Sequence, residues 1–198
     1  MKMILTLLFL LAQVGTAPTA REAMDRIRAK TPVEAVSVTS AEQLAGRYSS
    51  ASEEKRKRSG LPMGGFDLYL FSDMTYVFCN WTDVSPYMVF DKGSWKLKDG
   101  LITLARDPDL PWDPDKYYNF DMKYIAIQRV ANKSEALLVG VDRKLPYFEE
   151  KAGQDPAWML LVVALKREKA IEAGNSAKTK TNLMKKAWRP EFYRGASK

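Results

Sequence analysis

The sequence predicts a mainly β fold of the α+β class: an antiparallel β-meander curled into a small barrel or half-barrel, with a C-terminal helix packed on it. Short apolar segments separated by tight turns fill residues 66–141. No strand alternates with a long helix, which argues against βαβ units and a parallel sheet. A length of 198 residues, with 46% hydrophobic and 28% charged side chains, is typical of one globular domain with appendages.

Residues 1–20 have the layout of a secretory signal peptide. Lys2 precedes an apolar stretch over residues 4–14, and small residues follow, so that cleavage is expected after Ala17 or Ala20. The alternative is a retained, buried N-terminal helix. Cys79 is the single cysteine, and a disulfide-free exported protein favours a bacterial envelope. The expected location is therefore secreted or periplasmic.

Residues 21–48 are expected to form a short helical N-terminal segment. Met24 and Ile27 have helical spacing, and Ser40 with Gln43 has the spacing of a capping box. The basic run over residues 55–58 follows serines and precedes glycines and a proline, so a solvated, mobile loop is expected over residues 49–65. A processing site or an anionic contact is the alternative interpretation of this run.

Alternating and β-rich segments predict the strands of a single β-meander domain over residues 49–174. The clearest turn is Asp99-Gly100, which suits the positive φ angles of a type I′ hairpin. In that hairpin Trp95 should face the core while Lys96 and Lys98 face water. The strands are expected over residues 66–71, 75–81, 87–90, 95–98, 101–104, 124–130 and 135–141.

Gly93-Ser94-Trp95 resembles the G-x-W element of lipocalins and related calycin barrels. Those proteins carry the element on their first strand, whereas about three strands are expected before it here. The resemblance covers three residues and implies a barrel, with no binding function carried over.

The last predicted helix begins at Asp155-Pro156, a capping Asp followed by Pro, and continues to Gly174. Residues 175–198 form a basic tail with seven basic residues and one acid, a net charge of +6 out of +7 for the chain. Such a tail with interleaved aromatic rings could contact an anionic envelope surface such as lipid headgroups. The alternative is a solvated terminus. The candidate contacts are Lys185, Lys186, Trp188 and Arg189.

Aromatic side chains are the candidate ligand-binding residues, because rings clustered at a barrel mouth can hold an apolar or sugar-like ligand. The competing interpretation is that they fill the barrel interior. A cavity lined by Tyr and Trp would favour small-molecule binding, and a filled interior would favour a scaffold or partner-binding role. The candidates are Trp81, Trp95, Trp112, Tyr117 and Tyr118.

Clustered carboxylates between residues 107 and 115 form a candidate cation site, with calcium as the one cofactor considered. Their spacing does not match an EF-hand, and Asp-Pro pairs also form ordinary solvated turns. The candidate ligands are Asp107, Asp109, Asp113 and Asp115.

The absence of histidine and the lone cysteine exclude an intrachain disulfide, a Cys/His zinc site and an imidazole-based triad. The leading hypothesis is an exported, monomeric, non-enzymatic binding or interaction domain of unknown ligand, with no nucleic-acid partner and no transmembrane span. The alternatives are a carboxylate-dependent hydrolase of the cell envelope and a peripheral binder of anionic surfaces through the tail. The acids considered for the hydrolase are Asp83, Asp91, Asp121, Glu149 and Glu150.

Overall fold

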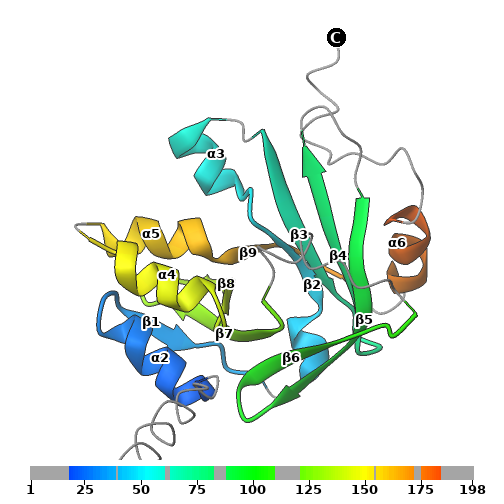
Figure 1. Cartoon of the computed structure of the whole chain (residues 1–198), viewed down its shortest axis with the longest axis horizontal. Helices are drawn as coiled ribbons and strands as arrows, with labels where there is room; N and C mark the ends of the chain where they lie inside the picture. Colours follow the sequence, from blue (N-terminus) through cyan, green and yellow to red (C-terminus); the bar gives the residue numbers. More distant parts are fainter. Residues whose placement is uncertain are drawn as a thin grey trace, which may run out of the picture.

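A closed, eight-stranded antiparallel barrel forms the centre of the computed structural model (Figure 1). The structure describes residues 18–38, 40–60, 63–82, 88–109, 121–153, 155–171 and 175–183. Each strand from β2 to β9 pairs with the next along the chain, and β9 returns to β2, which closes the ring. The predicted β-meander barrel is therefore confirmed. The strands are β2 (Gly46–Ser49), β3 (Gly64–Leu70), β4 (Thr75–Thr82), β5 (Met88–Lys98), β6 (Leu101–Arg106), β7 (Lys123–Arg129), β8 (Asn132–Gly140) and β9 (Leu165–Ala170).

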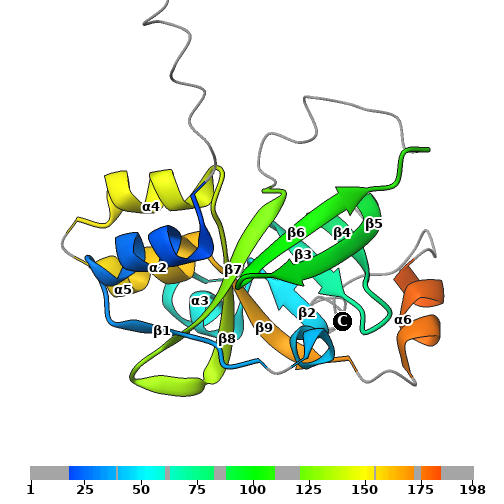
Figure 2. The same ribbon diagram turned by 90° about the horizontal axis from the view of Figure 1, so that it is seen from below.

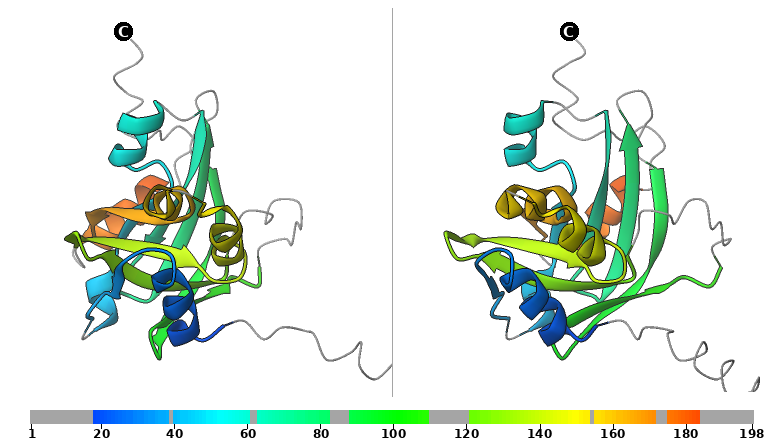
Figure 3. Two further views of the ribbon diagram at one scale, coloured as in Figure 1. Left: turned by 90° about the vertical axis from the view of Figure 1, so that its left-hand side faces the viewer. Right: turned by 60° about the vertical axis from the view of Figure 1, so that its left-hand side comes forward.

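The strand periodicity sorts apolar side chains into the barrel interior and onto its outer wall. The Asp99-Gly100 turn has φ angles of 51° and 77°, as a type I′ hairpin requires, and it places Trp95 in the interior. Large rings and aliphatic chains pack the interior, and the curvature of the strands around them is visible in Figure 3. These interior residues include Tyr48, Leu68, Leu70, Tyr76, Phe78, Trp95, Ile102, Leu104, Tyr124, Leu138 and Leu165.

Three helices cover one side of the barrel and a fourth covers the opposite side (Figures 1 and 2). The helices α2 (Ala20–Arg28), α4 (Lys144–Lys151) and α5 (Pro156–Val163) share an apolar cluster with the outward residues of β7 and β8. The helix α6 (Ser176–Leu183) lies within the segment expected to be a basic tail. Its Leu183 packs in the cluster on the outer face of β3 and β4.

The N-terminal segment contains a predicted helix and a strand that sequence reasoning missed. The helix α2 carries a full capping box between Thr19 and Glu22. The strand β1 (Val33–Ala35) follows and pairs with the second half of β7. The turn expected at Ser40 is the 3₁₀ helix η1 (Ala41–Leu44), although the Ser40 side chain makes no capping hydrogen bond there.

The prediction of one helix from Asp155 to Gly174 is wrong in its second half. Asp155 caps α5 as expected, accepting from Trp158 N at 2.9 Å, but α5 ends at Val163 and residues 165–170 form β9. This strand joins β8 to β2, and without it the barrel would be open. The backbone pairing available on both sides outweighs the helical propensity of a Lys- and Glu-rich segment.

The loop expected over residues 49–65 contains the helix α3 (Glu53–Ser59), which is a second correction. Ser52 accepts from Lys55 N, acids occupy the first turn and basic residues the last, a charge order that favours a helix. Intramolecular partners occupy the basic run. Arg58, for example, lies over the Trp158 ring at 4.2 Å and pairs with Asp155.

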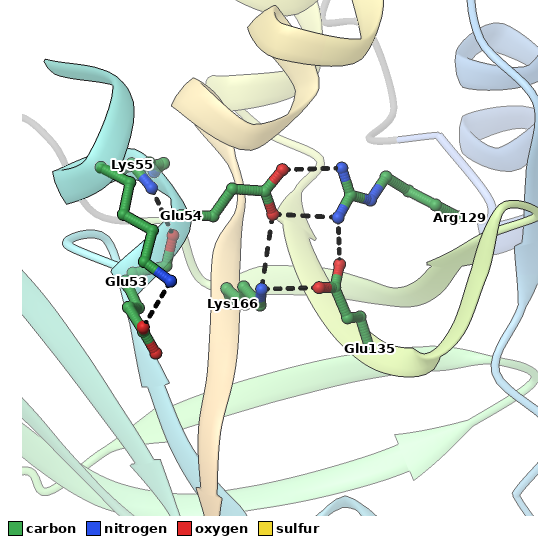
Figure 4. A network of polar contacts seen from close by, with 8 residues as sticks. Glu53, Glu54, Lys55, Arg129, Glu135 and Lys166 are labelled. Carbon is green, nitrogen blue, oxygen red and sulfur yellow. Dashed lines mark hydrogen bonds and ion pairs between the residues drawn. The ribbon is translucent and has the colours of Figure 1, made fainter.

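A network of four charges fixes α3 against the barrel wall (Figure 4). Glu54 of α3 pairs with Arg129 of β7 at 2.9 Å and with Lys166 of β9 at 3.4 Å. Glu135 of β8 contacts the same two cations. Beside this network, the Lys55 ammonium donates to the backbone oxygens of Ser50, Val162 and Ala164.

Within the described residues, no helix combines the length and the apolar character needed to span a membrane.

Candidate functional site

One edge of β7 is divided between two neighbouring strands, and we call the junction between these strands the slit. The strand β6 pairs with β7 as far as Ile125, opposite Leu101. The strand β1 pairs with β7 from Ile127, opposite Ala35. Ala126 lies between the two pairings, and its carbonyl oxygen accepts from Val36 N at 3.2 Å. The partner of β7 therefore changes from β6 to the chain of β1 between Ile125 and Ala126.

A cavity of about 370 Å³ opens at this slit, between α2, the chain that follows β1, and the β5–β6 hairpin. Its volume lies near the lower end of the range for small-molecule sites, about 300–1,000 Å³. Aliphatic side chains form most of the lining, and Ala126 is one of the lining residues. The lining includes Ala20, Met24, Ala35, Val36, Val38, Leu44, Leu97, Ile125 and Ala126, with Arg21, Asp25, Arg28, Asp99 and Gly100 also present.

The helical wall of the cavity is held firmly in place. Ala23 and Ile27 of α2 are fully buried against the outer wall of the barrel. Arg26 donates from Nε to Glu149 of α4 at 2.6 Å, and this hydrogen bond holds the pKa of Glu149 below its usual range. Because α2 is anchored by apolar packing and by an ion pair, the cavity is formed before any ligand arrives.

Four charged residues surround the apolar lining, and two of them have partners. The Arg28 guanidinium donates from Nε to Val33 O at 3.1 Å, and its Nη1 lies 3.9 Å from Asp25. Within the described residues, the side chains of Arg21 and Asp99 form no hydrogen bond or ion pair. Arg21 belongs to α2 and Asp99 to the tip of the β5–β6 hairpin, so an unpaired cation and an unpaired anion come from two different walls.

The structure does not bring the predicted aromatic ligand-binding residues together. Trp95 lies inside the barrel, where its Nε1 donates to Phe71 O at 2.9 Å. Trp81 is buried in the cluster on the outer face of β3 and β4, and neither ring lines the cavity. A ligand-binding role for these rings stays a prediction. Trp112, Tyr117 and Tyr118 lie outside the described residues.

The described part of the candidate cation site is engaged in local contacts. Asp107 accepts from Asp109 N at 3.1 Å and pairs with Lys92 at 3.3 Å. No group of three or more metal-ligating acids or cysteines occurs among the described residues. Asp113 and Asp115 lie outside them, as do the candidate surface contacts of the tail, Lys185, Lys186, Trp188 and Arg189.

Each of the described acids considered for a hydrolase has a partner within the chain. Asp91 is buried in the barrel and accepts from the Tyr76 hydroxyl at 2.7 Å. Asp121 accepts from Arg143 N at 2.6 Å, beside the start of α4. Glu149 pairs with Arg26, and Glu150 pairs with its neighbour Lys151. Asp83 lies outside the described residues.

Sequence reasoning missed the cavity residues, because the lining consists of ordinary aliphatic side chains from α2, the chain after β1, β5 and β7. The sequence did contain one signal for the strand β1, because the apolar residues in the short segment 33–38 needed another strand to pair with. Comparisons with known proteins found no protein family, no curated protein and no solved structure that matches this chain. Its site is therefore interpreted from geometry.

Proposed function

We propose that the chain is an exported, non-enzymatic binding protein that holds a small, mainly apolar molecule in the slit cavity. The observation that carries the proposal is the cavity of about 370 Å³ at the break between β1 and β6, lined mostly by aliphatic side chains. Burial of apolar ligand surface against such a lining contributes about 25 cal/mol per Å². Large rings pack the barrel interior, so the ligand is assigned to the wall and not to the centre.

Partial exposure of the lining supports this assignment. Val36, Val38, Leu97 and Ala126 are partly buried, although they pack against the interior cluster. Apolar side chains in this state leave surface that a ligand can cover. The expected ligand is small, because a larger molecule would have to displace α2, which is anchored to α4 through Arg26.

The experiment titrates the purified protein with N-phenyl-1-naphthylamine, a neutral apolar dye whose fluorescence rises in apolar surroundings. The wild-type protein is expected to bind it in a saturable way. Ala126→Phe adds a phenyl ring at a residue that lines the cavity, and this variant is expected to bind the dye at least tenfold more weakly. Leu97→Trp narrows the cavity from another wall and serves as the second variant if Ala126→Phe does not fold.

The matched control is Ala29→Phe, which adds the same ring at an exposed position at the end of α2, outside the lining. This variant is expected to bind the dye as the wild type does. Absence of saturable binding to the wild type, or equal affinity in Ala126→Phe and Ala29→Phe, would overturn the proposed function.

A further inference from the structure

We infer that the ligand of the slit cavity is an amphiphile with a zwitterionic head, whose apolar part occupies the lining and whose two opposite charges meet Arg21 and Asp99. The inference rests on the proposed function and names the class of ligand that the cavity would select. Both residues line the cavity and both are exposed, so a head group can reach them without either charge being buried.

The two walls that carry these charges approach each other closely. Gly100, the second residue of the hairpin turn, has φ of 77°, and a Cβ added there would lie 3.3 Å from Ala20 Cβ. Arg21 follows Ala20 and Asp99 precedes Gly100, so the cation and the anion border the same contact between α2 and the hairpin. A head group with one charge of each sign can therefore pair with both residues from a single position.

The charge balance of the lining excludes a strong preference for a singly charged head. Arg21 and Arg28 are matched by Asp25 and Asp99, so the four charges sum to zero. An anionic head attracted by Arg21 would be repelled by Asp99, and a cationic head attracted by Asp99 would be repelled by Arg21. Because Arg28 and Asp25 already interact with each other, Arg21 and Asp99 remain for the ligand.

The test compares three probes with the same octyl chain: octylphosphocholine, nonanoate and octylamine, each displacing bound N-phenyl-1-naphthylamine at pH 7. The wild-type protein is expected to bind octylphosphocholine about two- to fivefold more tightly than either singly charged probe. This range corresponds to about 0.4–1 kcal/mol, as expected for exposed ion pairs. The difference is expected to shrink in high salt, because the charges are exposed.

Two charge-removing variants sharpen the test. Arg21→Gln is expected to shift the preference towards octylamine, and Asp99→Asn towards nonanoate, each by a similar factor. Both variants preserve the fold, since Gln is a good helix former and Asn suits the type I′ turn. The dye affinity of each variant is measured first, so that displacement can be converted into the affinity of each probe.

The outcomes separate the inference from the proposed function. The head-group inference is wrong, and the cavity remains a binding site, in any of three cases in which the dye binds. These cases are equal binding of the three probes, failure of the probes to displace the dye, and a change of all three probe affinities alike in both variants. If the dye itself does not bind, the proposed function fails as well.

Discussion

The four-charge network beneath α3 predicts a large, measurable coupling between Glu135 and Lys166. The Lys166 ammonium lies 2.6 Å from Glu135 Oε1, and the two side chains are 16% and 12% exposed. Replacing Glu135 by Gln preserves the shape of the side chain but leaves Arg129 and Lys166 sharing Glu54. Because two cations then face one carboxylate, the variant should lose stability beyond the loss of one hydrogen bond.

The coupling energy between Glu135 and Lys166 is the difference between an electrostatic attraction and a desolvation cost. At 2.6 Å and an effective dielectric constant of about 20, the attraction is about 6 kcal/mol. Removing the two ions from water costs several kcal/mol and cancels most of this attraction. A coupling energy of about 1–3 kcal/mol between Glu135 and Lys166 remains, and Glu135→Gln alone should cost about 2–4 kcal/mol.

The assay is urea unfolding at pH 7 of the wild type, Glu135→Gln, Lys166→Met and the double variant, followed by tryptophan fluorescence. Glu150→Gln is the matched control, because Glu150 is exposed and should change stability by less than about 0.5 kcal/mol. A coupling energy below about 0.5 kcal/mol would refute the reasoning, because it would make the network no stronger than a surface ion pair.

Acid gives an independent check of the same network. Burial alone would raise the pKa of Glu54, but hydrogen bonds and charge from Arg129 and Lys166 outweigh it and hold that pKa below its usual range. The folded state then binds the proton of Glu54 less readily than the unfolded chain does. The stability from Glu54 should therefore be complete above its ordinary pKa of about 4.3 and lost as the pH falls through the lower folded value.

Three further predictions concern packing, charge burial and capping. Gly140→Ala would place a Cβ 2.2 Å from Cγ of the buried Asp121, so a loss of about 1–3 kcal/mol is expected in urea unfolding. Burial lowers the pKa of Lys55 to about 8, so the unfolded chain binds more protons between that pH and 10.5. The free energy of unfolding that is lost in Lys55→Met should therefore increase with pH across this window. Unfolding compared at pH 7 and pH 10 should show an increase of up to about 3 kcal/mol. Thr19→Ala should cost about 1 kcal/mol, seen as a lower Tm, because it removes the side-chain oxygen that caps α2.

Local pairing explains which parts of the barrel could be predicted from the sequence. The β3–β4 and β5–β6 hairpins join strands that are neighbours in the chain, so alternation and turn residues such as Asp99-Gly100 were sufficient. The strand β9 differs, because its partners β2 and β8 are brought to it by the closed ring. Its Lys- and Glu-rich sequence has no strand signal of its own, and a helix prediction that ignored barrel closure continued through it.

The helix α3 was predictable in part and was missed because the charged run was interpreted by composition. Ser52, the acids at 53 and 54, and the basic residues after them have the order of a capped helix. The packing that holds this helix was not predictable, since Glu54 finds its cations on β7 and β9, more than 70 residues away. Local order thus indicates the helix, and only the fold supplies its partners.

The location of the cavity follows from how the barrel uses its rings. Trp95, one of the rings that suggested a ligand site, is buried in the barrel interior together with Tyr48 and Tyr76. The partner of this edge of β7 changes from β6 to the chain of β1 beside Ala126, and most residues that line the cavity there are small or aliphatic. A function inferred from residue type alone therefore points to the rings, whereas strand register points to Ala126. Register is set by pairing between segments that are distant in the chain. The change of partner strand at Ala126, and the binding site proposed there, can therefore be recognised only in the closed structure.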